Sequence, residues 1–168
     1  MNRNKIIHGV IGGLAGGLIF GIMMGTMGML PMVGKMVGYP SATVGFVVHM
    51  INSAIIGAAF GLVLGRFASQ FGASAGLGLA YGSLWWLLGP LTLMPLFLGM
   101  DFGVNWSVAA ALKMLPSLLG HAIYGVVLGV VYSMLGSRAA VGVTAPAERP
   151  SAAREMQPQV ALRTESRR

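Results

Sequence analysis

Residues 6–34 read IIHGVIGGLAGGLIFGIMMGTMGMLPMVG and contain no Asp, Glu, Lys or Arg. Three further stretches without these residues follow, at 36–65, 67–100 and 114–137. A helix crosses the roughly 30 Å of membrane hydrocarbon with about 20 mostly apolar residues, so each stretch is long enough. The sequence therefore predicts an all-α integral membrane bundle of four transmembrane helices.

The composition agrees with a membrane protein. Of 168 residues, 55% are hydrophobic and only 9% are charged, whereas soluble domains carry roughly 25% charged residues. Such a chain cannot form a separate water-soluble domain, so we expect one membrane domain over residues 1–136 followed by a tail over 137–168. The absence of cysteine excludes disulfides, thiolate metal sites and thiol nucleophiles.

The four helices are predicted at about 7–32, 41–65, 74–98 and 114–136. Pro40 and Pro116 fall near the starts of the second and fourth helices, where the first-turn N–H groups have no intrahelical partner. Pro90 and Pro95 lie inside the third helix, which we expect to kink or break towards its end. The tail is basic, rich in Ala, Pro and Ser, and lacks an apolar stripe, so it is predicted to be disordered.

The positions of the basic residues predict the orientation. The net charge is +7, but most of the Lys and Arg lie near the N-terminus and in the tail, which favours a topology signal over nucleic-acid binding. Arg66 lies between the second and third helices, whereas Lys35 and Lys113 lie on the opposite side. We therefore expect both termini in the cytoplasm of a bacterial cell, and the loops at 34–40 and 99–113 outside the plasma (inner) membrane.

An internal repeat relates the second and fourth helices. The matching positions are His49 with His121, Asn52 with Tyr124, Gly57 with Gly129, and Phe60 with Tyr132. The first and third helices match more loosely, through pairs of glycines and a Pro near each end. Because each copy is a two-helix hairpin with an even number of spans, the pattern predicts two parallel repeats.

Glycines recur at four-residue spacing on the helices. In lipid, small residues let helix backbones approach closely, and this contact replaces the hydrophobic drive that operates in water. We expect these glycines to pack the helices, and a glycine stripe left over would serve a homo-oligomer or a larger membrane complex. The predicted packing residues are Gly13, Gly17, Gly21, Gly25, Gly57, Gly61, Gly125 and Gly129.

Two histidines are the candidate functional residues, because ionisable side chains inside a membrane are the usual markers of function. His49 and His121 occupy equivalent positions in the repeat. Two neutral imidazoles on facing helices suit a b-type haem or a metal such as copper. Met24, Met27 and Met50 lie at a similar depth, and their soft sulfur atoms favour Cu(I).

A purely structural role for the same residues stays open. Methionine is a common filler of apolar interfaces, and a transmembrane histidine often only bonds a neighbouring helix. Asn52 and Tyr124, one turn away on the same face, are the candidate partners of the imidazoles. No phosphate loop, HExxH motif, cysteine or intramembrane carboxylate points to an enzyme. We therefore favour a non-enzymatic accessory or assembling membrane component over a haem- or copper-binding protein, with a small transporter or channel as the third alternative.

The stretch YGSLWWLLGPLTLMP at 81–95, together with GHAIYG at 120–125, resembles uncharacterised four-span bacterial membrane proteins. The resemblance covers about residues 8–136. It implies a bacterial plasma membrane and no established activity, and no functional residue is carried over from it.

Overall fold

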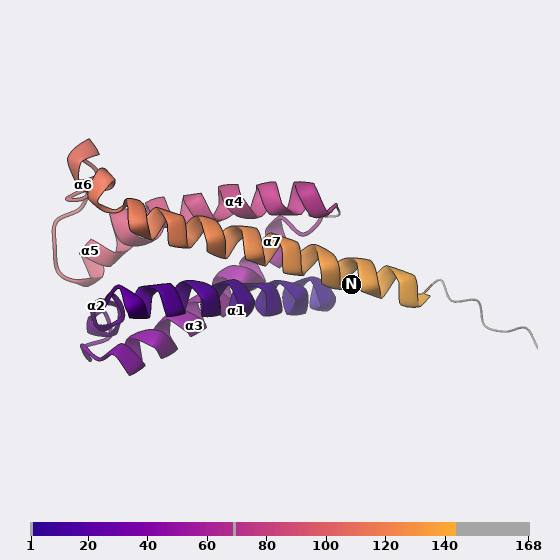
Figure 1. The fold of residues 1–168 in the computed structure, drawn as a ribbon, viewed down its shortest axis with the longest axis horizontal. Coiled ribbons are helices and arrows are strands. Elements are labelled where there is room, and N and C mark those ends of the chain that lie inside the picture. Colours follow the sequence, from indigo (N-terminus) through magenta and orange to yellow (C-terminus); the bar gives the residue numbers. More distant parts are fainter. Residues whose placement is uncertain (1, 69, 144–168) are drawn as a thin grey trace, which may run out of the picture. The chain divides into compact units, whose positions relative to one another are not determined.

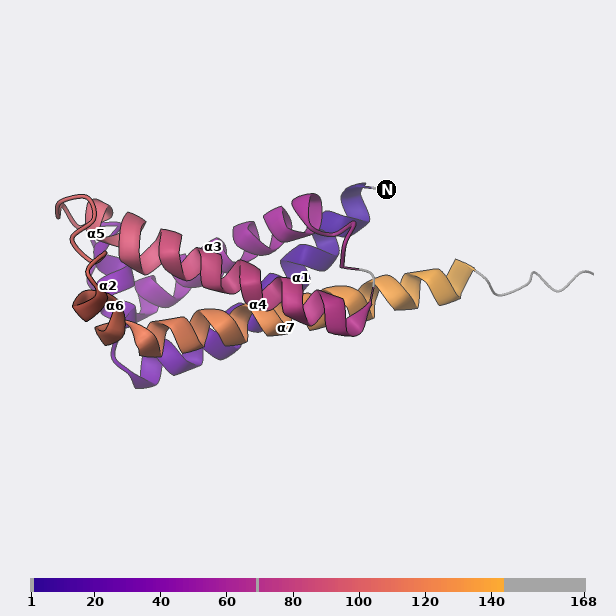
Figure 2. The same ribbon diagram turned by 90° about the horizontal axis from the view of Figure 1, so that it is seen from above.

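The computed structural model describes the backbone of residues 2–68 and 70–143, and Figures 1 and 2 show it in two perpendicular views. Residues 1–138 form one compact unit, which contains the helix packing and the cavities described below. All the regular elements within the described residues are helical. In chain order they are α1 (Asn2–Thr26), α2 (Leu30–Lys35), α3 (Ala42–Val63), α4 (Phe71–Leu88), the π-helical turn η1 (Gly89–Leu93), α5 (Met94–Phe97), α6 (Val108–Lys113) and α7 (Leu115–Val143).

Four helical segments are long and apolar enough to cross a membrane. They are Arg3–Thr26, Ala42–Val63, Phe71–Phe97, which includes η1 and α5, and Leu115–Ser137. The all-α fold with four spans is thereby confirmed, and the chain is a polytopic membrane protein. The helical form follows from the solvent, because a helix satisfies its backbone N–H and C=O groups internally where no water can do so.

The first predicted helix is wrong at both ends. α1 begins at Asn2 instead of residue 7, and it stops at Thr26 instead of continuing to residue 32. Gly28 has φ +67°, a left-handed conformation that glycine adopts readily and that ends a helix. Pro31 then lies in the first turn of the short helix α2, where its missing N–H costs nothing.

The predicted break in the third helix is confirmed. Regular α-helix ends at Leu88, and the chain continues through η1 into α5. Pro90 has no N–H to donate to the preceding turn, so the regular α-helical pattern is interrupted there. The N–H of Met94 instead donates to the carbonyl of Gly89, five residues back, which is the π-helical pattern.

The last helix is longer than predicted. α7 extends to Val143, so residues 137–143 are helical and the predicted start of a disordered tail at 137 is wrong. Arg and Ala are good helix formers, and Arg138, Ala139 and Ala140 allow the helix to continue beyond the apolar run. The rest of the predicted tail, residues 144–168, lies outside the described part of the chain.

The connecting segments are sorted between two ends of this unit. In both views α2, α5 and α6 lie at one end, whereas the N-terminus and the connection from α3 to α4 lie at the other (Figures 1 and 2). The two loops predicted to lie outside the membrane therefore share an end, and Arg66 lies at the opposite one.

Helices pack as two pairs through glycines that meet a neighbouring backbone. In the pair α1–α3, a Cβ atom built on Gly57 would lie 2.8 Å from the Gly13 Cα. In the pair α4–α7, a Cβ on Gly125 would overlap the carbonyl oxygen of Gly78. Such close approach is available only to residues without a side chain. Gly17, Gly21, Gly61 and Gly129 also have interhelical neighbours at these short distances, whereas Gly25 meets Leu30 at an ordinary 3.5 Å.

The two pairs use matching contacts. In α1–α3 the contacts are Gly13 with Gly57, Gly17 with Ser53, and Gly21 with His49; in α4–α7 they are Ser74 with Gly129, Gly78 with Gly125, and Gly82 with His121. The contact residues of α3 and those of α7 are 72 residues apart in the sequence, which is also the distance between His49 and His121 in the sequence repeat. The repeat stays a prediction, which this agreement supports.

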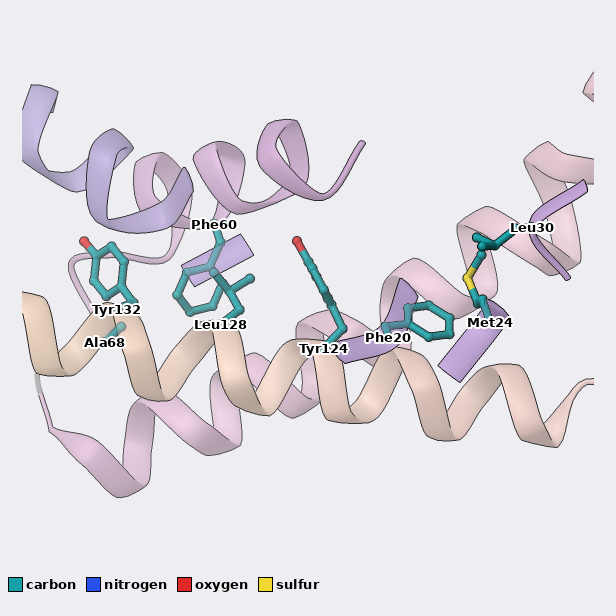
Figure 3. Close-up of a cluster of buried hydrophobic side chains, with 8 residues drawn as sticks. All are labelled: Phe20, Met24, Leu30, Phe60, Ala68, Tyr124, Leu128 and Tyr132. Atoms are coloured by element: carbon teal, nitrogen blue, oxygen red, sulfur yellow. The ribbon is translucent and has the colours of Figure 1, made fainter. Parts of the chain in front are cut away.

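The pairs are joined by a buried cluster and by two hydrogen bonds. Phe60 of α3 and Leu128 of α7 are fully buried against each other in the cluster drawn in Figure 3. The Tyr124 hydroxyl donates to the Ser53 carbonyl, and the Tyr81 hydroxyl donates to the Ile56 carbonyl, both at 2.9 Å. Both bonds run from the α4–α7 pair to α3 and therefore hold the two pairs together.

Candidate functional site

A cavity of about 310 Å³ lies within the membrane-spanning helices, and we call it the inner cavity. Phe20 and Met24 of α1, His49 of α3, and Ser117 and His121 of α7 contribute to its lining. The remaining wall comes from other residues of α3 and α7, from α2 and the residues flanking it, and from α4, η1 and α5, and it is mostly apolar. The volume is at the lower end of the roughly 300–1,000 Å³ of ligand pockets, so it suits a small ligand.

His49 is held across the α1–α3 pair. Its Nε2 lies 2.8 Å from the carbonyl oxygen of Gly17. A carbonyl can only accept, so Nε2 carries the proton and donates, which leaves a free lone pair on Nδ1. The ring is partly buried and lines the inner cavity.

His121 is held within its own helix and has the opposite tautomer. Its Nδ1 lies 2.8 Å from the carbonyl oxygen of Ser117, so Nδ1 donates and Nε2 keeps a free lone pair. The Ser117 hydroxyl is also near, at 3.4 Å from Nδ1. A Cβ atom on Gly89 would lie 3.8 Å from Nε2, which places this lone pair beside the start of η1.

One aromatic ring touches both imidazoles. The Phe20 ring centroid lies 5.3 Å from that of His49 and 4.8 Å from that of His121, each in an edge-to-face arrangement. Sequence reasoning overlooked Phe20 as a site residue, although it stands alone as the aromatic of its glycine-rich helix. The two histidines therefore reach the same cavity from α3 and α7, and both lie against the same ring.

The predicted methionines are separated by the structure. Met24 is 5% exposed and lines the inner cavity. Met27 is 44% exposed and is absent from the lining, and Met50 lies towards Gly17 of α1, with its sulfur 3.6 Å from where a Cβ would be. Three other thioethers line the inner cavity instead, from Met29, Met36 and Met94.

The two polar residues predicted to bond the histidines, Asn52 and Tyr124, make no such hydrogen bond among the described residues. Tyr124 lines the cavity, but its hydroxyl donates to the Ser53 carbonyl. Asn52 lines the cavity with an exposed side chain. The imidazoles bond to backbone carbonyls, which no pattern of side chains in the sequence could have indicated.

The inner cavity is open on the side between α3 and the segment η1–α5. Ile55 and Phe97 both line it, yet they are 62% and 63% exposed. Both residues belong to segments that are long and apolar enough to cross a membrane. Trp85 also lines the cavity, and its indole N–H has no hydrogen-bond partner among the described residues.

A second cavity, of about 490 Å³, lies beside the first, and we call it the outer cavity. Pro90 and Met94 line both cavities, so the two are neighbours. The outer cavity contains three more thioethers, from Met32, Met100 and Met114, and its lining has one charged residue, Lys35.

The described residues contain no group of three or more His, Cys, Asp or Glu side chains arranged to hold a metal ion. A metal in the inner cavity would therefore depend on the two imidazoles and the thioethers. Comparison with known proteins adds no relative: no family model, curated protein or solved structure matches the chain.

Proposed function

We propose that this protein is a non-enzymatic component of the bacterial plasma membrane that binds a small ligand in the inner cavity. One observation carries the proposal: His49 and His121 line the same mostly apolar cavity inside the membrane domain, and each keeps one ring nitrogen with a free lone pair. Apolar walls with a few convergent polar groups are the usual design of a small-molecule site.

The cost of placing polar groups in lipid supports a binding role. A polar side chain in a membrane span is expensive and is kept where it bonds a partner or faces a cavity. Each of the two imidazoles does both, since one nitrogen bonds a carbonyl and the ring lines the inner cavity. The lining contains neither a carboxylate nor a thiol, which favours binding over hydrolytic chemistry.

We further propose that the termini face the cytoplasm. Arg3, Lys5 and Arg66 belong to the end of the unit that holds the N-terminus, whereas Lys35 and Lys113 belong to the other end. Positive charge is enriched in cytoplasmic segments, so the first end is the cytoplasmic one. The inner cavity then lies in the outer half of the membrane, and the outer cavity lies near the external surface.

The binding role is tested by what the protein carries from the membrane. We expect native mass spectrometry of the protein, purified in mild detergent from bacterial membranes, to show a bound mass. Leu93 lines the inner cavity and is 40% exposed at its opening, so Leu93→Trp should obstruct the cavity and lower the bound fraction.

Leu79→Trp is the matched control, because Leu79 is similarly exposed, at 45%, on α4 but is absent from the lining. This variant should keep the bound mass of the unaltered protein. A protein that carries no extra mass, or one that carries it equally in both variants, would contradict the proposed role.

A further inference from the structure

We propose that the ligand of the inner cavity is monovalent copper, held by Nδ1 of His49, Nε2 of His121 and thioether sulfur. This inference rests on the proposed function, because it names the ligand of the same cavity. It follows from the tautomers of the imidazoles, the other donors in the lining and the residues that the lining lacks.

The imidazoles are oriented as metal ligands usually are. A metal-binding histidine commonly donates its other ring N–H to a carboxylate, a backbone carbonyl or water, which fixes the tautomer and the ring. His49 donates to Gly17 and His121 donates to Ser117, each to a carbonyl at 2.8 Å. Either ring nitrogen of a neutral imidazole can bind a metal, so the opposite tautomers are both competent.

The other donors of the lining are soft. Four thioethers line the inner cavity, from Met24, Met29, Met36 and Met94. Thioether ligands select Cu(I) among the common biological metals, whereas Mg²⁺, Ca²⁺ and Mn²⁺ prefer carboxylate and carbonyl oxygens. The lining has no carboxylate. Methionine is also flexible enough to bring its sulfur to an ion without moving the helices.

The geometry favours a bare ion over a haem. Nε2 of His49 is already bonded to the Gly17 carbonyl, so only Nδ1 of this residue is free for iron. A single ion needs little of the 310 Å³.

The outer cavity provides a route for the ion. It carries the thioethers of Met32, Met100 and Met114, and Pro90 and Met94 line both cavities, so a shift of these side chains would join the two. Thioethers thus extend from the external end to the histidines. Lys35, the charged residue of this lining, is exposed, so its ammonium group can extend into water and away from the route.

The test is a competition titration on the full chain. The protein in mild detergent, kept reduced and free of oxygen, is titrated with Cu(I) against a coloured Cu(I) chelator, bicinchoninate. We expect one tight equivalent per chain, with an affinity that falls at least about tenfold in His49→Ala and in His121→Ala. His8→Ala is the control, because His8 packs against Tyr132 and is absent from both cavity linings.

A second pair of variants tests the thioethers. Met24→Leu removes a buried sulfur from the inner cavity and keeps the side chain's size, whereas Met27→Leu removes an exposed sulfur outside it. X-ray absorption at the copper edge should show nitrogen and sulfur neighbours, with less sulfur in Met24→Leu alone. A copper environment of nitrogen only, or equal sulfur loss in both variants, would overturn the thioether assignment.

The outcomes separate the two proposals. Absence of tight Cu(I) binding, binding that survives in a His49→Ala, His121→Ala double variant, or a haem Soret band in the purified protein would each overturn copper as the ligand. If copper fails while native mass spectrometry still finds a mass that Leu93→Trp removes, the cavity binds another ligand and the proposed function stands. If neither signal is found, both proposals fall.

Discussion

Glycines on the same helix have different roles, and the residue opposite each one decides which. On α4, a Cβ atom on Gly78 would overlap the carbonyl oxygen of Gly125 and lie 2.8 Å from its carbonyl carbon. Two residues earlier on the same helix, a Cβ on Gly76 would meet nothing within 4 Å. The spacing of glycines in the sequence does not distinguish these cases, whereas the contacts do.

We therefore expect Gly78→Ala to destabilise the protein, because the added methyl group pushes α4 away from α7. The cost should be about 1–3 kcal/mol, as for overpacking of a close contact. Reversible unfolding of the detergent-solubilised protein measures it. Gly76→Ala is the control and should leave stability unchanged or slightly higher, since Ala favours helix more than Gly does. Equal losses in both variants would show that the α4–α7 contact is not the cause.

Among the elements, the segment α4–η1–α5 shapes both cavities. Gly89, Pro90 and Leu93 of η1 line the inner cavity, followed by Met94 and Phe97 of α5. A π-helical turn holds one more residue than an α-helical turn, so it changes the direction of every later side chain. The break at Pro90 therefore determines which residues of α5 face the cavity.

Pro90→Ala should remove this effect. The restored N–H can join the α-helical hydrogen-bond pattern, and a return from π to α geometry would rotate the following side chains by about 100°, one residue's step in an α-helix. We expect a cysteine introduced at Met94 to change its rate of reaction with a small thiol reagent when Pro90 is also replaced. Pro116→Ala should leave that rate unaltered, because Pro116 lies in the first turn of α7, where no intrahelical N–H bond is lost. An unchanged rate in the Pro90 variant would mean that tertiary contacts, and not the proline, hold the π turn.

At the scale of the whole membrane unit, the proposed topology places its two ends on opposite sides of the membrane. Asp101 is exposed in the loop between α5 and α6, and Gln70 is exposed just before α4. Since the chain has no cysteine, single cysteines at these positions report on the sides of the membrane without a background.

We expect Asp101→Cys to react with an impermeant maleimide from outside intact spheroplasts, and Gln70→Cys to react only in inverted vesicles. We expect this pattern because Arg66 lies in the same turn as Gln70, and positively charged turns stay in the cytoplasm. The opposite labelling pattern would reverse the proposed orientation and place the two cavities on the cytoplasmic side.

The sequence by itself determined the spans and the interruption of the third one. In lipid, a long uncharged run can satisfy its backbone N–H and C=O groups only by forming a helix. A proline inside the run has no backbone N–H to donate, so it interrupts the helix. Both features can be predicted without knowing which residues pack against the run. His49 and His121 were also found from the sequence, because polar side chains are conspicuous in an apolar run. The turn at Gly28 was missed, since glycine also occurs throughout the helices.

Only the tertiary structure decided how the site is assembled. Met24 and Met27 are three residues apart on α1, yet only Met24 faces the inner cavity, because packing against α3 and α7 fixes the rotation of the helix. The same packing brings Phe20 against both imidazoles and the Gly17 carbonyl against His49. A sequence lists the donors along each helix, but the free nitrogen of His49 depends on the Gly17 carbonyl of another helix, and these two residues become neighbours only when the bundle forms.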